Sequence, residues 1–283
     1  MLDSISQHRY GNGVTKRSTL PEAAMTAAAH TTTRLAYDDE GAGTPVVFLH
    51  GLTFDRRSWR PIIDRLGDSV RSIAIDLPAH GESRGAPPPV EQVPARLHEL
   101  LAALAADRPI VVGHSMSGGL ACLYASAHPT RGVVVIDNGP DIRPFAELVH
   151  RLEPALRGPR FAEVWPRFEN SLGLERIPEP ARSLVLATHE VNQDVVIAYW
   201  EMALRSDPAE LQAWIDTIMA KLDVPCLGVF GRPITDGERE RFERLSDAEL
   251  EEWAGAGHFV HLVDPDRFTT RLRQFVDHCT AGG

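Results

Sequence analysis

The chain has 283 residues, of which 43% are hydrophobic and 24% charged, as in ordinary soluble globular proteins rather than disordered or fibrous ones. Its 29 Lys and Arg residues against 39 Asp and Glu give a formal net charge of −10, which disfavours nucleic acid as a partner by repulsion. The cysteines Cys122, Cys226 and Cys279 lack the short spacing of metal sites, so we expect no metal and a reduced, cytoplasmic setting.

Residues 1–24 show no periodic apolar pattern before Met25. We interpret them as a disordered extension, with a vector remnant or an upstream start as the alternatives. No run approaches the roughly 20 apolar residues of a membrane-spanning helix, and the N-terminus lacks the apolar segment of a secretory signal. The sequence therefore predicts a protein without a membrane partner.

Short apolar runs alternate with helical patterns through the first half of the chain. This rhythm is typical of parallel strands joined by crossover helices. The expected strands are residues 45–49, 71–75, 109–113 and 132–136, and the expected helices are residues 58–66, 91–106 and 117–127.

The pattern changes after residue 140. Residues 141–220 contain long helical patterns interrupted by prolines and no clear strand, which indicates a helical insertion. Strand patterns return at 225–230 and 249–253, and a final amphipathic helix is expected at 264–279. The prediction is an α/β fold with a mostly parallel sheet, in which residues 25–140 and 221–283 form the core and residues 141–220 form a helical cap.

The most informative motif is Gly113-His114-Ser115-Met116-Ser117, which follows a buried strand and opens a helix. A serine on so tight a strand-to-helix turn can act as a nucleophile, provided that the residues two positions away on either side are small. Gly113 and Ser117 meet that condition. A serine that only caps the helix would give the same local pattern.

Two further segments could complete a catalytic site around Ser115. After the first strong strand, His50-Gly51-Leu52 can turn the chain so that the Leu52 N–H is exposed, and with the Met116 N–H it would form an oxyanion hole. Late in the chain, His258 lies on a glycine loop between the last strand and the terminal helix. We expect His258 to act as the general base and acid.

These segments resemble the α/β-hydrolase fold family, in particular its small, cap-bearing, esterase-like bacterial members. The resemblance rests on His50-Gly51, on Asp76-Leu77-Pro78-Ala79-His80-Gly81-Glu82-Ser83, on the Ser115 motif, and on Gly257-His258 followed by Asp264-Pro265. It covers the chain from about Thr31 onward. It implies helices on both faces of the sheet, a Ser–His–acid triad, no cofactor, and a substrate pocket between the sheet and the cap.

The acid of this triad is the point at which the chain departs from the family pattern. Members of the fold usually place it about three residues after the glycine that ends the penultimate strand, but Ile234 occupies that position after Gly231. Asp236 is the nearest substitute, although Thr235 and Glu238 around it have the spacing of a capping box. Asp137, directly after the strand at 132–136, is our first candidate, and Asp236 remains the alternative.

A serine nucleophile forms an acyl-enzyme, which favours carboxylic esters, lactones or thioesters as substrates. Aromatic residues in the insertion and the lack of a Lys or Arg cluster there suggest a small apolar or aromatic substrate. The alternatives are C–C bond hydrolysis or perhydrolysis on the same triad, or a non-hydrolytic binding or lyase function. The sequence leaves the oligomeric state open, a homodimer included.

Overall fold

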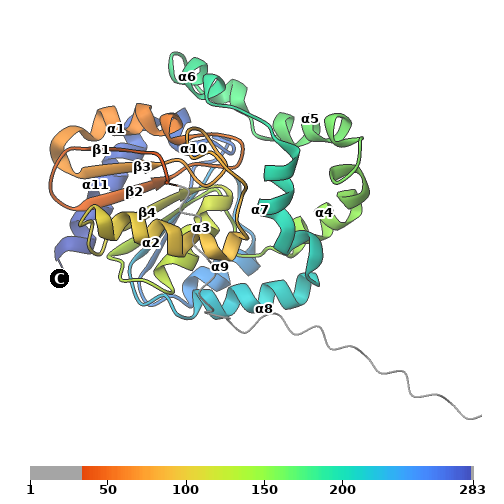
Figure 1. Cartoon of the computed structure of the whole chain (residues 1–283). Helices are drawn as coiled ribbons and strands as arrows, with labels where there is room; N and C mark the ends of the chain where they lie inside the picture. Colours follow the sequence, from red (N-terminus) through yellow and green to blue (C-terminus); the bar gives the residue numbers. More distant parts are fainter. Residues whose placement is uncertain (1–33, 282–283) are drawn as a thin grey trace, which may run out of the picture. The chain divides into compact units, whose positions relative to one another are not determined.

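The structure, a computed structural model, describes residues 34–281 (Figure 1). Its seven-stranded sheet has the order β1-β3-β2-β4-β5-β6-β7, and all neighbouring strands are parallel except the antiparallel pair β1 and β3. The mostly parallel sheet predicted from the sequence is therefore confirmed. The strands are β1 (Tyr37–Glu40), β2 (Pro45–Leu49), β3 (Arg71–Ile75), β4 (Ile110–His114), β5 (Gly132–Ile136), β6 (Cys226–Phe230) and β7 (Ala248–Glu252).

The central strands are short runs of branched apolar residues. All five residues of β4, β5 and β6 are buried, which is typical of parallel strands covered on both faces. Because side chains alternate along a strand, Val111 faces one half of the core and Val112 the other. Each face therefore needs its own layer of helices.

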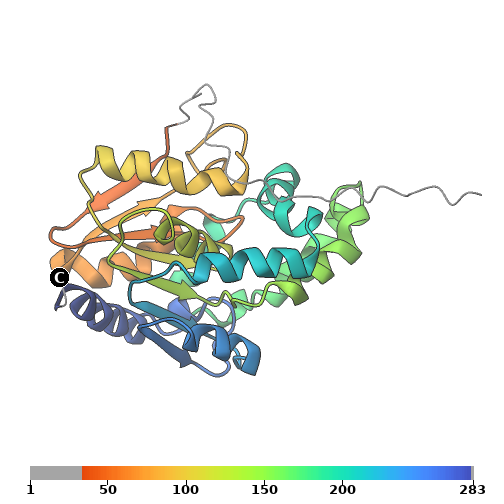
Figure 2. The same ribbon diagram turned by 90° about the horizontal axis from the view of Figure 1, so that it is seen from below.

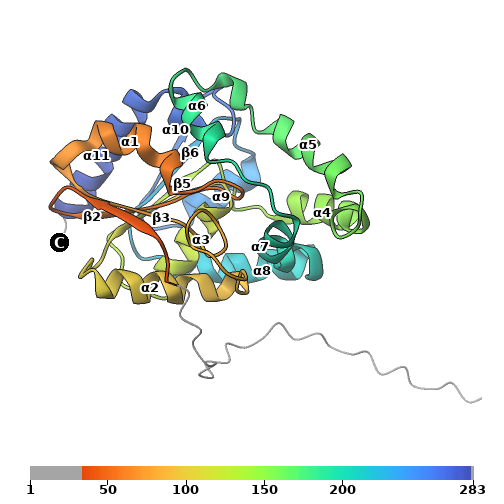
Figure 3. The ribbon, with the colours of Figure 1, turned by 45° about the horizontal axis from the view of Figure 1, so that its top comes forward.

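Helices cover both faces, as expected (Figure 3). On one face, α2 (Val93–Ala103), α3 (Met116–Ala125) and α9 (Asp236–Glu243) contribute buried residues such as Leu97, Leu120 and Phe242. On the other face, the core is filled from α1 (Arg60–Leu66), α10 (Val260–Val263) and α11 (Pro265–Ala281), as Ile62, Leu262 and Phe268 illustrate.

The region between β5 and β6 is helical and takes up the green-to-cyan part of the ribbon (Figures 1 and 2). Most of its helices lie beside one another, whereas the helix Ala181–Ala187 lies apart from them, against the 3-10 turn Arg56–Trp59 of the core. The region touches the core at the carboxyl ends of the strands. The Glu190 N–H donates to the carbonyl of Thr53 after β2, and the Tyr199 hydroxyl donates to that of Pro78 after β3. Its helices are α4 (Arg143–Leu156), α5 (Phe161–Ser171), α6 (Ala181–Ala187), α7 (Gln193–Arg205) and α8 (Pro208–Met219).

Some boundaries differ from the sequence expectations. Strand β1 was not expected, because Tyr-Asp-Asp-Glu has no apolar run; it forms at the sheet edge, where Arg71 pairs with Asp39. Helix α2 is shorter than the expected 91–106, because a 3-10 turn precedes it and Ala105 has a φ of 51°. The expected extension 1–24 and the start of the core at residue 25 lie outside the described residues.

Residues 34–281 hold neither a candidate membrane span nor a candidate metal site. From residue 34 to 281, no helix is both long and apolar enough to cross a membrane. Over these residues there is also no group of three or more His, Cys, Asp or Glu side chains that could hold a metal ion.

Candidate active site

Ser115 lies between β4 and α3 in a backbone conformation that is unusual for a residue with a side chain. Its φ of 56° and ψ of −132° turn the chain sharply, and its N–H donates to the Ile136 carbonyl over 2.8 Å. Such strain persists only where the surroundings enforce it, and it is frequent at functional sites. The turn leaves Ser115 half-buried at the start of α3.

The small residues around Ser115 are required by close packing. A Cβ atom on Gly113 would lie 1.9 Å from the Ser117 carbonyl oxygen, so only glycine fits there. Ser117, where a glycine is more usual, donates its buried hydroxyl to the His50 carbonyl over 2.5 Å. Its hydroxyl therefore ties the turn at Ser115 to the loop after β2.

Asp137 and His258 are brought together by the ends of two non-adjacent strands. The Asp137 Oδ2 and the His258 Nδ1 are 2.8 Å apart, and the two side chains are 8% and 21% exposed. The other carboxylate oxygen of Asp137 accepts the Gly231 N–H over 3.1 Å. With Nδ1–H donating to the carboxylate, the free lone pair of His258 is on Nε2, as a general base requires.

Two glycines allow the loop of His258 to reach Asp137. A Cβ on Gly231 would lie 1.9 Å from the Gly257 carbonyl oxygen, and Gly257 has a φ of 75°. The Gly257 N–H donates to the Gly231 carbonyl over 3.1 Å. The loops after β6 and β7 therefore touch along their backbones, which places the His258 ring over Asp137.

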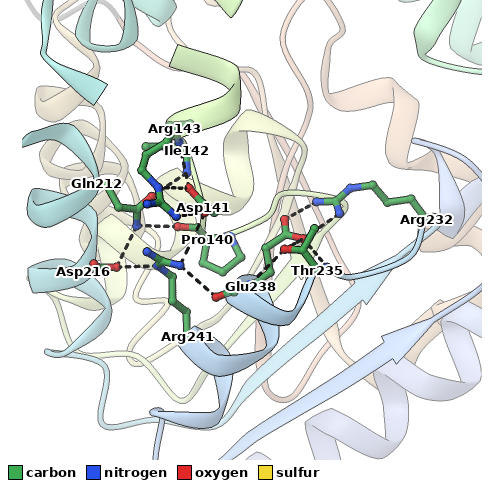
Figure 4. A network of polar contacts seen from close by, with 11 residues as sticks. Pro140, Asp141, Ile142, Arg143, Gln212, Asp216, Arg232, Thr235, Glu238 and Arg241 are labelled. Atoms are coloured by element: carbon green, nitrogen blue, oxygen red, sulfur yellow. Dashed lines mark hydrogen bonds and ion pairs between the residues drawn. The ribbon is translucent and has the colours of Figure 1, made fainter. Parts of the chain in front are cut away.

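Asp236 is not part of this arrangement. It is exposed in the first turn of α9, where Thr235 and Glu238 form a complete capping box. Although burial raises the pKa of Glu238, hydrogen bonds from Arg232 and Thr235 and the Arg232 charge hold it below its usual range. Figure 4 shows these bonds within a network that also links α9 to α8 and to the start of α4 through Arg241, Asp216 and Gln212.

The expected oxyanion donors belong to two segments next to Ser115, the loop after β2 and the first turn of α3. An ideal Cβ on Gly51 would be 3.5 Å from the Ser115 Cβ, so the loop with Leu52 runs beside the serine. Leu52 lies in a loop, and within residues 34–281 its N–H donates no hydrogen bond. The Met116 N–H is in the first turn of α3, where a helix offers no acceptor of its own. Within the described residues, both N–H groups therefore lack a hydrogen-bond acceptor.

The described residues contain no hydrogen bond between Ser115 and His258. His114, which precedes Ser115 in the chain, contacts His258 and so lies between the two residues. The sequence motif contains His114 but does not indicate this contact. The His114 ring centroid is 4.8 Å from that of His258, and its Nε2 lies 2.9 Å from the His258 carbonyl oxygen. In free enzymes, a bond between nucleophile and base often forms only when substrate is bound.

Several buried imidazoles around the site are kept neutral. Burial lowers the pKa of His50 to about 4 and those of His80 and His261 to about 3. Burial, reinforced by neighbouring histidines, also holds the pKa of His114 well below its ordinary value. A neutral ring can still donate one hydrogen bond, as the Nδ1 of His50 does to the Gly51 carbonyl.

These histidines predict a loss of stability in mild acid. Because their pKa values are lowered in the folded protein, the unfolded chain binds more protons once the pH falls below about 6.5, and the folded state is destabilised from there down to about pH 3. One pH unit below that value, protonation in the unfolded chain costs the folded state roughly 1 kcal/mol for each of His50, His80 and His261. We expect the melting temperature to fall by at least about 5 °C between pH 7.5 and 5.5.

The control for this effect compares two histidines of different exposure. His261→Phe removes a buried titrating ring among aromatic neighbours, so its melting temperature should depend less on pH than that of the wild type. His278→Gln changes a half-exposed ring and should leave the dependence unchanged. If the melting temperatures of His261→Phe and wild type depended on pH in the same way, the buried His261 ring would not contribute to the loss of stability in acid.

The loops after four neighbouring strands each contain a non-glycine residue with positive φ. These are Thr53 after β2, Ala79 after β3, Ser115 after β4 and Asp137 after β5, with φ values of 70°, 65°, 56° and 47°. Such residues are uncommon in proteins, and a β-branched one such as Thr53 is a genuine outlier. Four of the six non-glycine residues with positive φ among the described residues therefore lie at the carboxyl edge of the sheet, which holds Ser115 and Asp137; the other two, Ala105 and Arg108, precede β4.

The aromatic residues of the helical region pack mainly on one another. The Trp200 ring is within 6 Å of those of Phe145, Trp165 and Phe168, and Tyr199 packs on His80. A cavity of about 840 Å³ lies between this region and the loops after β2 and β3, where Phe54, His80 and Val195 contribute to its lining. Neither Ser115 nor His258 lines that cavity.

Several enzymes resemble this chain over most of its length. A non-heme chloroperoxidase of Kitasatospora aureofaciens is 26% identical over 85% of this chain and 95% of its own. A 2-succinyl-6-hydroxy-2,4-cyclohexadiene-1-carboxylate synthase of Serratia proteamaculans is 26% identical over 82% of this chain and 92% of its own. The structure of a thermophilic esterase from Thermogutta terrifontis matches with a TM-score of 0.65 and 26% identity, over 87% of this chain and 93% of that one.

The family assignment follows from a match that spans most of the described chain. The family model described as "Alpha/beta hydrolase family" matches residues 46–271, from the second residue of β2 to a point beyond β7, and so includes the segments with Ser115, Asp137 and His258. The sheet order and the helices on both of its faces agree with that fold. The chain belongs to the alpha/beta hydrolase family of enzymes.

Proposed function

We propose that the protein is a serine hydrolase that cleaves a carboxylic ester, lactone or thioester through an acyl-enzyme on Ser115. The observation that carries the proposal is the 2.8 Å contact between Asp137 and the Nδ1 of His258, beside a serine held at positive φ between β4 and α3. A carboxylate on Nδ1 sets the tautomer that leaves Nε2 free to accept a proton. Few structural roles require this combination.

In the proposed reaction, the Ser115 hydroxyl oxygen attacks the substrate carbonyl carbon while His258 Nε2 takes its proton. The carbonyl oxygen becomes negative and is stabilised by the N–H groups of Leu52 and Met116. When this intermediate collapses, the bond from the carbonyl carbon to the leaving oxygen or sulfur breaks, and the leaving group takes the proton from His258. Ser115 then carries the acyl group. Water, deprotonated by His258, releases the acid and regenerates the serine.

The helical residues 141–220 serve in this proposal as a cap over the site. They contact the loops after β2 and β3, and open parallel sheets bind ligands at this edge. Several arginines of this region pair with carboxylates of the same region, as Arg157 does with Glu153 and Glu201. Because these positive charges are neutralised within the cap, we propose a small uncharged substrate with an apolar or aromatic group.

The test is a combined labelling and turnover experiment. A fluorophosphonate probe should label the protein once, at Ser115, and p-nitrophenyl acetate should be hydrolysed. Labelling without turnover of esters, lactones or thioesters would favour a lyase or a binding function, in line with the synthase among the relatives. Absence of labelling in folded protein would contradict the proposal.

Perhydrolysis is the second candidate, and the chloroperoxidase relative favours it. On the same serine, hydrogen peroxide would replace water as the attacking group and give a peracid from the acyl-enzyme. Halogenation of monochlorodimedone with acetate, bromide and peroxide measures this activity. A peracid rate above the ester hydrolysis rate at equal acyl-donor concentration would make it the main reaction.

A further inference from the structure

Thr53 has a backbone conformation that its own side chain disfavours. It is 2% exposed, it follows the proposed oxyanion donor Leu52 directly, and its φ is 70°. For a residue other than glycine this conformation is strained, and it persists only where neighbouring contacts enforce it. The position of the Leu52 N–H therefore depends on what holds Thr53.

Three contacts hold Thr53, and one of them comes from outside the core. Its N–H points to the His80 Nε2 at 3.4 Å, and its hydroxyl donates to the Leu52 carbonyl over 2.5 Å. Its carbonyl oxygen accepts the N–H of Glu190, from the loop between α6 and α7, over 2.8 Å. This third contact joins the cap directly to the oxyanion loop.

A second contact between the same segments involves aromatic rings. The His189 ring stacks on Phe54 with a centroid distance of 4.8 Å and an angle of 24°. Phe54 in turn meets the edge of Phe259, the residue after His258, at 5.1 Å. Burial lowers the pKa of His189, although the charge of Glu169 acts against this shift, so the ring stacks in its neutral form near pH 7.

We propose that residues His189 and Glu190 form a latch that positions the Leu52 N–H for catalysis. The latch holds Thr53 in its left-handed conformation, and Thr53 acts as a positioning residue through Leu52. The inference rests on the proposed serine hydrolase function. It assigns to the cap a part in stabilising the transition state, in addition to covering the site.

The test compares two substitutions at Glu190. Glu190→Pro removes the N–H that Thr53 accepts, whereas Glu190→Ala removes only an exposed side chain and keeps it. Losing an oxyanion donor outright costs about a hundredfold to a thousandfold in kcat, so misplacing one should cost about tenfold. We expect that loss for Glu190→Pro with KM within about twofold of wild type, and wild-type kcat for Glu190→Ala.

A transition-state mimic separates positioning from a general effect on the fold. A trifluoromethyl ketone forms a tetrahedral oxyanion on the serine, so its inhibition constant should rise in Glu190→Pro by the same factor by which kcat/KM falls. Glycine adopts a φ near 70° without strain, so Thr53→Gly should partly restore kcat in the Glu190→Pro background. A merely structural role for Glu190 would not produce these parallel changes.

A pair of variants at His189 keeps the test decisive if Glu190→Pro does not fold. His189→Ala removes the ring that stacks on Phe54 and should lower kcat, whereas His189→Phe keeps a stacking ring and should retain it. Wild-type kcat in folded Glu190→Pro, or in His189→Ala where Glu190→Pro is unfolded, would overturn the latch. Absence of ester turnover in the wild type, with no labelling of Ser115, would instead overturn the proposed function.

Discussion

Ser115→Ala is expected to lower ester turnover by at least about ten-thousandfold, because loss of a triad serine removed about a millionfold in another enzyme. Alanine leaves the Gly113 and Ser117 packing unchanged, so the protein should fold and melt close to the wild-type temperature. Steady-state turnover of p-nitrophenyl acetate and fluorophosphonate labelling measure the effect.

Ser126 offers a matched control for this substitution. It lies at the far end of the same helix, where its hydroxyl donates to the Leu123 carbonyl. Ser126→Ala should retain turnover and labelling. A folded Ser115→Ala protein with a tenth or more of the wild-type rate would mean that another residue is the nucleophile.

Asp137→Asn is expected to lower kcat by at least about a hundredfold, since the equivalent change in a serine protease cost about ten-thousandfold. The asparagine oxygen can still accept the Gly231 N–H, but its amide would face the His258 Nδ1 and favour the wrong tautomer. Asparagine also tolerates the φ of 47° at this position, so the backbone should be preserved.

Asp236→Asn is the control for the triad acid. This carboxylate is exposed in the first turn of α9, so its loss should cost less than about tenfold in kcat, by weakening the helix at most. Both variants are compared with wild type at one pH and after a folding check. A larger loss in Asp236→Asn than in Asp137→Asn would transfer the role to Asp236.

Strands β2 to β6 could be predicted because they are continuous or nearly continuous buried runs, whereas β7, Ala-Glu-Leu-Glu-Glu, has no fully buried residue. The expected bounds of β2, β3 and β5 agree with the structure, and those of β4, β6 and β7 are displaced by one residue at one or both ends. Strand β1 could not be predicted in the same way. It carries three acidic residues and is stabilised by its pairing with β3, which lies about 35 residues further along the chain.

The candidate site was less accessible from sequence, because its decisive contacts are non-local. Spacing alone left Asp137 and Asp236 as alternatives, whereas the contact of Asp137 with His258 depends on the close approach of Gly231 and Gly257. The capping box at Thr235, which the sequence did indicate, is local and is present in the structure. The bond between Glu190 and Thr53 crosses 137 residues, and no motif signals it.

Four residues at the carboxyl edge of the sheet have a positive φ and together lower the stability of the folded protein: Thr53, Ala79, Ser115 and Asp137. If each costs about 1–3 kcal/mol, their sum is comparable to the whole stability of a typical domain, about 5–15 kcal/mol. Glycine at any of these positions relieves the strain, yet at Ser115 and Asp137 it also removes the groups on which the proposed chemistry depends. Stability and activity therefore oppose each other at this edge, and selection for heat resistance alone would tend to erode the active site.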